Sequence, residues 1–310
     1  MFIAAAAFLW GISATLGRAV FTERLPLRGE LVRPIDPVIL SQTRTSFSLL
    51  VLLPLLTFRK GWERIRLQKN DLIFCVTLGM LGVAASNYFY YVAIQRTSVA
   101  VAIILQYMAP VWVLFYVVMR GQQKLTLQRV GAVVVAITGI AFTIGLAGGK
   151  SALHLDSYGV LAAMIASFCF AFYNVGGHRI LARYDRWRVL AWTLGSASLL
   201  WFFVNPPWKI AHAHYTGPQW LFLLVFSVVS VLGPFSLYFL GLQHLEPSRA
   251  IIASCLEPVF SIALAATLLG EGLHSIQAFG MLLVLSAIVI VQLPSRGAPE
   301  QQTVVVDPVE

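Results

Sequence analysis

The chain carries very little charge for its length. Only 11% of its 310 residues are Asp, Glu, Lys or Arg, while 58% are hydrophobic. Soluble domains carry about 25% charged residues, so this composition suits lipid better than water as the surrounding solvent. The net charge of +9 does not indicate nucleic-acid binding, because the basic residues lie between apolar runs and do not cluster on one predicted face.

Cysteine pairs and catalytic motifs are also scarce. Cys75, Cys169 and Cys255 all lie inside apolar stretches, and none has a partner at the CxxC spacing of a metal knuckle. We expect no metal and no cofactor, since His212 and His214 are two ligands without a nearby acid. No HExxH motif, acid pair or Ser–His pair occurs within the apolar runs, which argues against a membrane-embedded enzyme.

Apolar runs of membrane-spanning length fill most of the chain. A span needs about 20 apolar residues, and the sequence predicts an all-α, polytopic membrane protein with ten of them and no inserted soluble domain. The predicted spans are Phe2–Phe21, Ile35–Thr57, Asp71–Ile94, Ser98–Val118, Thr126–Ala147, Ser157–Ile180, Arg188–Val204, Pro218–Gly241, Ser248–Leu269 and Ser275–Leu293. The first lacks a preceding basic region, so we interpret it as a helix and not as a signal peptide.

Lys and Arg residues between the spans predict the orientation. Thirteen of them lie in or beside the even-numbered connections, and six lie in the odd-numbered ones. Because loops rich in Lys and Arg stay in the cytoplasm, we expect both termini to be cytoplasmic and the protein to lie in a bacterial inner membrane. Arg24, Arg28 and Arg33 of the first connection oppose this rule.

The chain resembles itself at an offset of 148 residues. The matched pairs include Tyr90 and Tyr238, Gln95 and Gln243, and Pro110 and Pro258. We therefore divide the chain into a first five-helix repeat (1–147), a connecting loop (148–156), a second five-helix repeat (157–293) and a disordered cytoplasmic tail (294–310). Because five is odd, the second repeat begins on the opposite side of the membrane. Inverted repeats of this kind are typical of secondary transporters, and a duplicated scaffold without transport is the alternative.

Four short motifs accompany the paired halves. They are Trp10-Gly11 followed by Gly17-Arg18, Arg44, Glu257-Pro258-Val259-Phe260, and Leu268-Leu269-Gly270-Glu271. Together they resemble the drug/metabolite transporter superfamily, EamA-type, and most of all its bacterial aromatic amino-acid exporters, over Phe2 to Leu293. The resemblance implies a central cavity lined chiefly by the third, fourth, eighth and ninth of ten helices, with gating by the first, second, sixth and seventh. Gln122 departs from the pattern, because the family often has Glu there.

Glu257 is the most informative charge inside a predicted span. It lies near mid-depth, where a charged side chain costs about 2.5–3.5 kcal/mol on insertion scales and therefore marks a functional site. Ser254 and Ser261 share its helical face. We predict that its carboxylate binds a substrate ammonium or cycles a proton. The alternative is a protonated acid that satisfies backbone groups freed by Pro258.

Arg44 is the other deeply placed charge. Its guanidinium suits a bidentate contact with a substrate carboxylate, and the alternative is an arginine that ties its helix to neighbouring carbonyls. We assign it a structural or gating role, together with Pro110 and Pro258, since prolines bend helices and free carbonyls.

Polar and aromatic residues at matching depth complete the predicted site. Gln106 and Ser254 each precede a span proline by one turn. The small-residue faces near Tyr90 and Tyr238 favour either close helix packing or a cavity wall. The full predicted substrate-binding set is Trp10, Asn87, Tyr90, Tyr91, Gln106, Phe170, Tyr173, Asn174, Tyr238, Ser254 and Glu257.

These residues favour a transporter that exports amino acids, aromatic or bulky neutral ones, by alternating access. A zwitterion needs one acidic and one donor-rich partner, and its side chain needs an apolar pocket. A carrier of another small metabolite or drug is the nearest alternative. From other classes, an enzyme or a scaffold is the alternative, and no repeated filter or ring of charge indicates a channel. The expected partners are a small-molecule substrate, namely an amino acid, and membrane lipid, with no nucleic acid.

Overall fold

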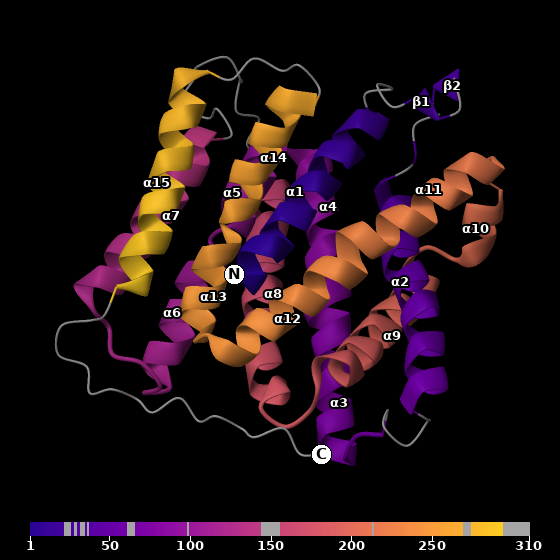
Figure 1. The fold of residues 1–310 in the computed structure, drawn as a ribbon, viewed down its shortest axis with the longest axis horizontal. Coiled ribbons are helices and arrows are strands. Elements are labelled where there is room, and N and C mark those ends of the chain that lie inside the picture. Colours follow the sequence, from indigo (N-terminus) through magenta and orange to yellow (C-terminus); the bar gives the residue numbers. More distant parts are fainter. Residues whose placement is uncertain are drawn as a thin grey trace.

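The protein is helical almost throughout (Figure 1). The computed structural model describes residues 1–21, 26–27, 30–31, 35, 37–60, 66–97, 99–143, 156–212, 214–268 and 274–293. Among these, two strands of two residues each, β1 (Pro26–Leu27) and β2 (Glu30–Leu31), pair antiparallel in the first connection. The predicted tail 294–310 and residues 148–155 of the predicted connecting loop lie outside the described residues.

The helices divide into two runs of similar make-up. Those of the first run are α1 (Phe2–Phe21), α2 (Pro37–Lys60), α3 (Lys69–Thr77), the π-helical segment η2 (Leu78–Ala85), α4 (Ser86–Arg96), α5 (Val99–Gln106), α6 (Ala109–Met119) and α7 (Leu127–Thr143). Those of the second run are α8 (Ser157–Leu181), α9 (Arg186–Val204), α10 (Pro207–Ala211), α11 (Gly217–Ser227), the π-helical segment η4 (Val228–Leu232), α12 (Gly233–His244), α13 (Pro247–Ser254), α14 (Leu256–Leu268) and α15 (Ser275–Gln292).

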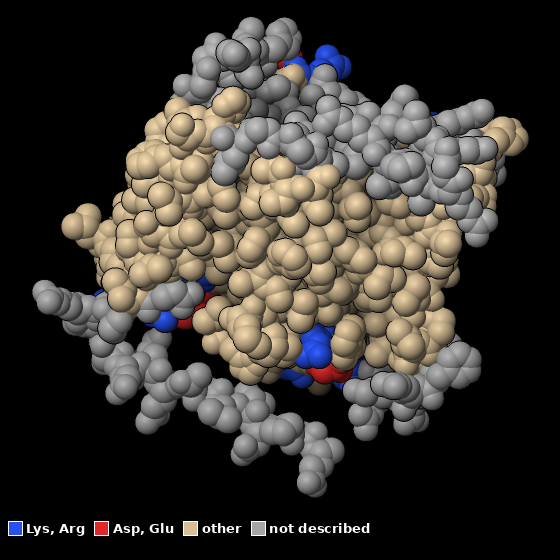
Figure 2. Space-filling model, turned by 45° about the horizontal axis from the view of Figure 1, so that its top comes forward, with Lys and Arg blue, Asp and Glu red and all other residues tan. Residues whose placement is uncertain are grey.

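Many of the helices are apolar, and several have the length that a bilayer requires. Six helical stretches within the described residues are long and apolar enough to span a membrane: Val38–Thr57, Lys69–Ala93, Ser157–Leu181, Arg186–Val204, Gly217–His244 and Pro247–Leu268. Four more apolar helices are shorter: Phe2–Leu16, Ala109–Met119, Leu127–Phe142 and Ser275–Val291. Figure 2 shows a broad surface of uncharged residues, with charged side chains near its edges. The chain is therefore a multi-pass membrane protein.

The helix bounds recur at one offset along the chain. Helix α3 begins at Lys69 and α11 begins at Gly217, 148 residues later. Helix α4 ends at Arg96 and α12 ends at His244, again 148 residues later. Helices α5 and α13 begin and end at this same offset. A π-helical segment lies inside both long helices, between α3 and α4 and between α11 and α12.

Helices of one run pack largely against helices of the other. Helix α1 lies along α12 and α14, while α8 lies along α4 and α5. Helices α7 and α15 pair lengthwise at one edge of the molecule (Figure 1). The pairing is close, since a Cβ added to Gly139 would lie 2.8 Å from the backbone nitrogen of Val284. Gly82 allows a similar approach of η2 to α8, because its added Cβ would lie 2.9 Å from that of Tyr173.

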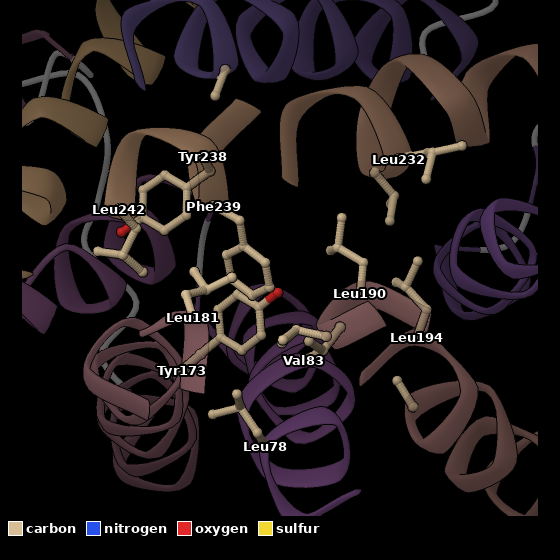
Figure 3. Packing of buried hydrophobic residues seen from close by; sticks show 14 of the residues in the cluster. Leu78, Val83, Tyr173, Leu181, Leu190, Leu194, Leu232, Tyr238, Phe239 and Leu242 are labelled. Atoms are coloured by element: carbon tan, nitrogen blue, oxygen red, sulfur yellow. The ribbon is translucent and has the colours of Figure 1, made fainter. Parts of the chain in front are cut away.

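The largest buried core lies between η2, α8, α9 and α12 (Figure 3). Tyr173 of α8 stacks on Phe239 of α12, with ring centroids 5.2 Å apart. Aromatic contacts of this kind stabilise a core beyond the area that they bury. The core also holds the fully buried Tyr238 and Trp201.

Ion pairs gather where α3 begins and α8 ends, at the lower edge of Figure 1. Arg183 donates to Asp71 over 3.1 Å, and the Tyr184 hydroxyl donates to the same carboxylate over 2.9 Å. Near the start of α13, Arg129 pairs with Glu246 at 3.2 Å. We call the end of the molecule that carries both ion pairs, Arg183–Asp71 and Arg129–Glu246, the basic end. There the backbone N–H of Gln68, just before α3, donates to the hydroxyl of Tyr184, just after α8.

Candidate functional site

A cavity of about 220 Å³ lies between the two runs of helices. Residues from seven parts of the fold form its wall: α1, α2, η2 with α4, α5 with the break before α6, α8, η4 with α12, and the start of α14. The lining residues are Trp10, Ala14, Ser41, Arg44, Thr45, Gly82, Val83, Ser86, Asn87, Tyr90, Tyr91, Ile103, Gln106, Tyr107, Phe170, Tyr173, Val231, Phe235, Glu257, Pro258, Ser261 and Ile262. We call it the central cavity.

Two helix breaks meet at the central cavity. Helix α5 ends at Gln106 and α6 begins at Ala109, while α13 ends at Ser254 and α14 begins at Leu256. Proline has no backbone N–H and clashes with the carbonyl four residues earlier. Pro110 therefore leaves the Gln106 carbonyl without its helical donor, and Pro258 does the same to the carbonyl of Ser254. Broken helices at mid-membrane are tolerated where they line a cavity.

Glu257 lies directly after the second break and faces the cavity. The hydroxyl of Tyr107, in the first break, donates to Glu257 Oε2 over 2.9 Å. This hydrogen bond joins the two broken helices, which belong to different halves of the chain. Among the described lining residues, Glu257 is the acidic side chain and Arg44 the basic one. Opposite charges on one small cavity suit a ligand that carries both an ammonium and a carboxylate.

Arg44 both lines the cavity and ties two helices together. Its Nη2 donates to the carbonyl of Ser230 in η4 over 3.2 Å. Its guanidinium also lies 5.6 Å from the ring centroid of Phe226, a cation–π contact. Its buried Nε has no partner among the described residues. The predicted tie to a carbonyl is therefore present.

Aromatic side chains form part of the remaining wall, beside small, aliphatic and polar residues. Trp10 meets Phe235 edge to face, with ring centroids 5.3 Å apart, and Tyr173 meets the same ring at 5.6 Å. Tyr90 and Tyr91 lie with ring centroids 5.8 Å apart. Aromatic rings offer an apolar surface for a ligand's side chain, and the tyrosines add hydroxyl groups.

Most of the predicted binding residues come together here. Those that line the cavity are Trp10, Asn87, Tyr90, Tyr91, Gln106, Phe170, Tyr173 and Glu257, and the predicted structural residues Arg44 and Pro258 line it too. Four predicted residues are not in its wall. Asn174 and Tyr238 are fully buried and hydrogen bonded to each other. The Ser254 hydroxyl donates to the Ile251 carbonyl over 2.7 Å, and Pro110 is buried in α6.

Tyr107 and Phe235 line the cavity but do not belong to the predicted set. That set favours polar residues matched at the 148-residue offset, and the residue that matches Tyr107 is Cys255. Phe235 matches Asn87, so an aromatic and an amide share one position of the repeat. The signal for Tyr107 is its place directly after Gln106 and three residues before Pro110.

The cavity lies away from the basic end. Its residues on α2, namely Ser41, Arg44 and Thr45, belong to the first half of that helix, and α2 ends at the basic end. Tyr173 borders both the cavity and the buried core. The core therefore lies between the cavity and the ion pairs of the basic end.

Comparison with known proteins identifies relatives of similar length. The chain is 24% identical over 295 residues to an uncharacterized inner membrane transporter, YicL, of Salmonella typhimurium, covering 94% of each chain. It is 27% identical over 248 residues to the threonine/homoserine exporter RhtA of Escherichia coli K12, covering 78% of this chain and 76% of that one.

Fold and family agree with these relatives. One crystal structure superposes with a TM-score of 0.72 at 17% sequence identity, over 94% of this chain and 95% of that one, which shows a shared fold. The model of the EamA-like transporter family matches residues 1–145 and 157–293. Since these two segments make up most of the chain, the protein belongs to the EamA-like transporter family, within the drug/metabolite transporter superfamily.

Proposed function

We propose that the protein exports amino acids, aromatic or bulky neutral ones, across the cell membrane by alternating access. One observation carries the proposal: Glu257 and Arg44 face one small cavity whose wall also holds seven aromatic side chains. A carboxylate for the substrate ammonium and a guanidinium for its carboxylate suit a zwitterion. Trp10, Phe170 and Phe235 suit an apolar side chain.

A second candidate is a small hydroxylated amino acid. The relative RhtA, a threonine/homoserine exporter, favours it. The hydroxyl and amide groups of Ser41, Ser86 and Asn87 line the same cavity. Both candidate substrates carry an ammonium and a carboxylate group. They differ in whether the substrate's side chain contacts the aromatic residues or the hydroxyl and amide groups of the cavity.

Alternating access rests on the predicted arrangement of ten spans in two inverted five-helix repeats, 1–147 and 157–293. The recurrence of helix bounds at 148 residues supports the duplication. The exchange of packing partners, α1 with α12 and α8 with α4, supports two related halves. With the basic end in the cytoplasm, as positive charge favours, the central cavity of this conformation faces outward.

Flux through reconstituted vesicles tests the proposal. Proteoliposomes are loaded with labelled phenylalanine, tryptophan, leucine or threonine, and efflux is measured with and without unlabelled substrate outside. Saturable efflux that unlabelled substrate accelerates is expected of a carrier, whereas linear leakage indicates a channel. No flux of any amino acid would refute the proposal.

Replacing Glu257 tests the site itself. We expect Glu257→Gln to abolish most of the saturable flux and change its pH dependence, because the neutral amide cannot pair with an ammonium. Asp185→Asn is the control, since Asp185 caps α9 on the surface, outside the central cavity. Unchanged flux and pH dependence in Glu257→Gln would leave only the structural role of this acid.

A further inference from the structure

A second cavity lies at the side of the molecule, between α2, α4, α9 and α10. Its volume is about 480 Å³. The lining residues are Val38, Ile39, Tyr88, Tyr91, Val92, Trp201, Val204, Asn205 and Lys209. We call it the lateral pocket. It lies where α9 ends and α10 begins, at the opposite end of α9 from the ion pairs of the basic end.

The lateral pocket offers donors and a positive charge. Lys209 lines it, and no acidic residue is among its described lining residues. The indole nitrogen of Trp201 is buried and has no acceptor within the described part of the chain, although a buried N–H normally has one. Asn205 donates to Gln42 over 2.6 Å, which fixes this wall of the pocket against α2. Donors around a lysine suit the oxygen atoms of an anion.

The other walls of the pocket are apolar and reach the outer surface. Val204 is 41% exposed and Tyr88 is 38% exposed, and the adjacent Phe203 is 73% exposed. In a bilayer, such a surface meets lipid chains. Trp208, beside Lys209, is 59% exposed, as is typical of aromatic residues at the level of lipid headgroups. An occupant of this pocket therefore needs an anionic head and an apolar chain.

We propose that the lateral pocket binds an anionic phospholipid. Its phosphate group pairs with Lys209 and accepts a hydrogen bond from Trp201, and an acyl chain lies against Val38, Val92 and Val204. Lipid binding does not depend on which substrate the protein carries.

Tyr91 links the lateral pocket to transport, because it lines both cavities. A lipid in the lateral pocket contacts this residue from the side facing away from the substrate. Bound lipid thus holds one wall of the central cavity in place, and we expect anionic lipid to change the concentration at which efflux saturates.

Native mass spectrometry of the full chain in detergent tests whether lipid binding depends on the positive charge of Lys209. Phosphatidylglycerol and phosphatidylcholine with the same acyl chains serve as probes. We expect phosphatidylglycerol to be retained better, and Lys209→Gln to weaken its retention about five-fold. Lys209→Arg keeps the charge and retains the lipid. Lys124→Gln, which removes an exposed lysine outside the pocket, has no effect.

A second pair of variants tests the pocket as distinct from surface charge. Val204→Phe fills the pocket and keeps Lys209, so phosphatidylglycerol retention falls. Val225→Phe adds the same group at a valine that is 55% exposed on α11, and retention is unchanged. Equal retention of the two lipids, or equal losses in Lys209→Gln and Lys124→Gln, would overturn the proposal. Competition by millimolar glycerol phosphate would also overturn it, in favour of a site for free anions.

Discussion

Tyr107→Phe is the sharpest test of how the cavity holds its substrate. The substitution removes one oxygen atom and keeps the ring that fills the break between α5 and α6. The lost contact is the 2.9 Å hydrogen bond to Glu257 Oε2. That distance is normal for an O–H donor and a carboxylate oxygen. If Tyr107 orients this carboxylate toward the substrate ammonium, the variant should fold normally and transport poorly.

The hydrogen bond sets the size of the expected effect. A hydrogen bond to a charged group contributes about 1.5–3 kcal/mol. A loss of about 2 kcal/mol in substrate binding corresponds to roughly a 30-fold fall in the ratio of maximal efflux rate to half-saturating concentration. Because Tyr107→Phe leaves the Glu257 carboxyl group in place, the fall should be smaller than in Glu257→Gln.

A double-mutant cycle on reconstituted protein measures this dependence. Efflux of labelled substrate is compared in the wild type, each single variant and Tyr107→Phe/Glu257→Gln. If the hydroxyl acts through the carboxylate, the double variant transports no worse than Glu257→Gln. Tyr116→Phe is the matched control, since Tyr116 is 38% exposed on α6 and outside the cavity. Fully additive losses, or equal behaviour of Tyr107→Phe and Tyr116→Phe, would refute the reasoning.

Three further predictions concern packing, the basic end and topology. Gly82→Ala places a methyl group 2.9 Å from the Tyr173 side chain and should lower the free energy of unfolding by about 1–3 kcal/mol. Gly131→Ala is the control: nothing lies within 4 Å of the added methyl group, so the free energy of unfolding should rise by about 0.4–1 kcal/mol. Equal shifts of the two variants in thermal unfolding would contradict this prediction. Asp71→Asn breaks the ion pair with a largely exposed arginine and should lower stability by about 1 kcal/mol, measured the same way, and an unchanged melting temperature would show that the pair contributes nothing. Cysteines placed at positions 68 and 185 should react with impermeant maleimide from the same, cytoplasmic side, and labelling from opposite sides would exclude the inverted repeats.

The apolar pattern predicted where helices lie better than how they are built. The predicted first span and α1 have the same bounds, Phe2–Phe21, because a long apolar run in a bilayer has few alternatives to a helix. The predicted third span, Asp71–Ile94, contains a π-helical segment that the sequence did not reveal. Such a segment depends on what the helix packs against, here α8 and α9.

The site could be predicted in outline for a similar reason. The charge of Glu257 alone singles it out, because an acid at mid-depth is costly and rarely occurs without a function. Neighbouring positions on a helix point about 100° apart, so a small error in helix orientation moves a side chain out of the cavity wall. Ser254 and Asn174 are displaced in this way, one bonded within its own helix and the other to Tyr238. The partner of Glu257 comes from the other half of the chain, where no local pattern indicates it.

The packing of helices from the first half of the chain against helices from the second half has a consequence for biosynthesis. Helix α1 packs on α12 and α14, which leave the ribosome more than 200 residues later. Until then the nascent chain sits in the bilayer with its first helices in place and the faces meant for α12 and α14 turned toward lipid. Insertion and folding are thus separated in time. The protein completes its structure only after the last helices are made, and a chain cut short before α12 would offer the cell's proteases an unpaired helix bundle.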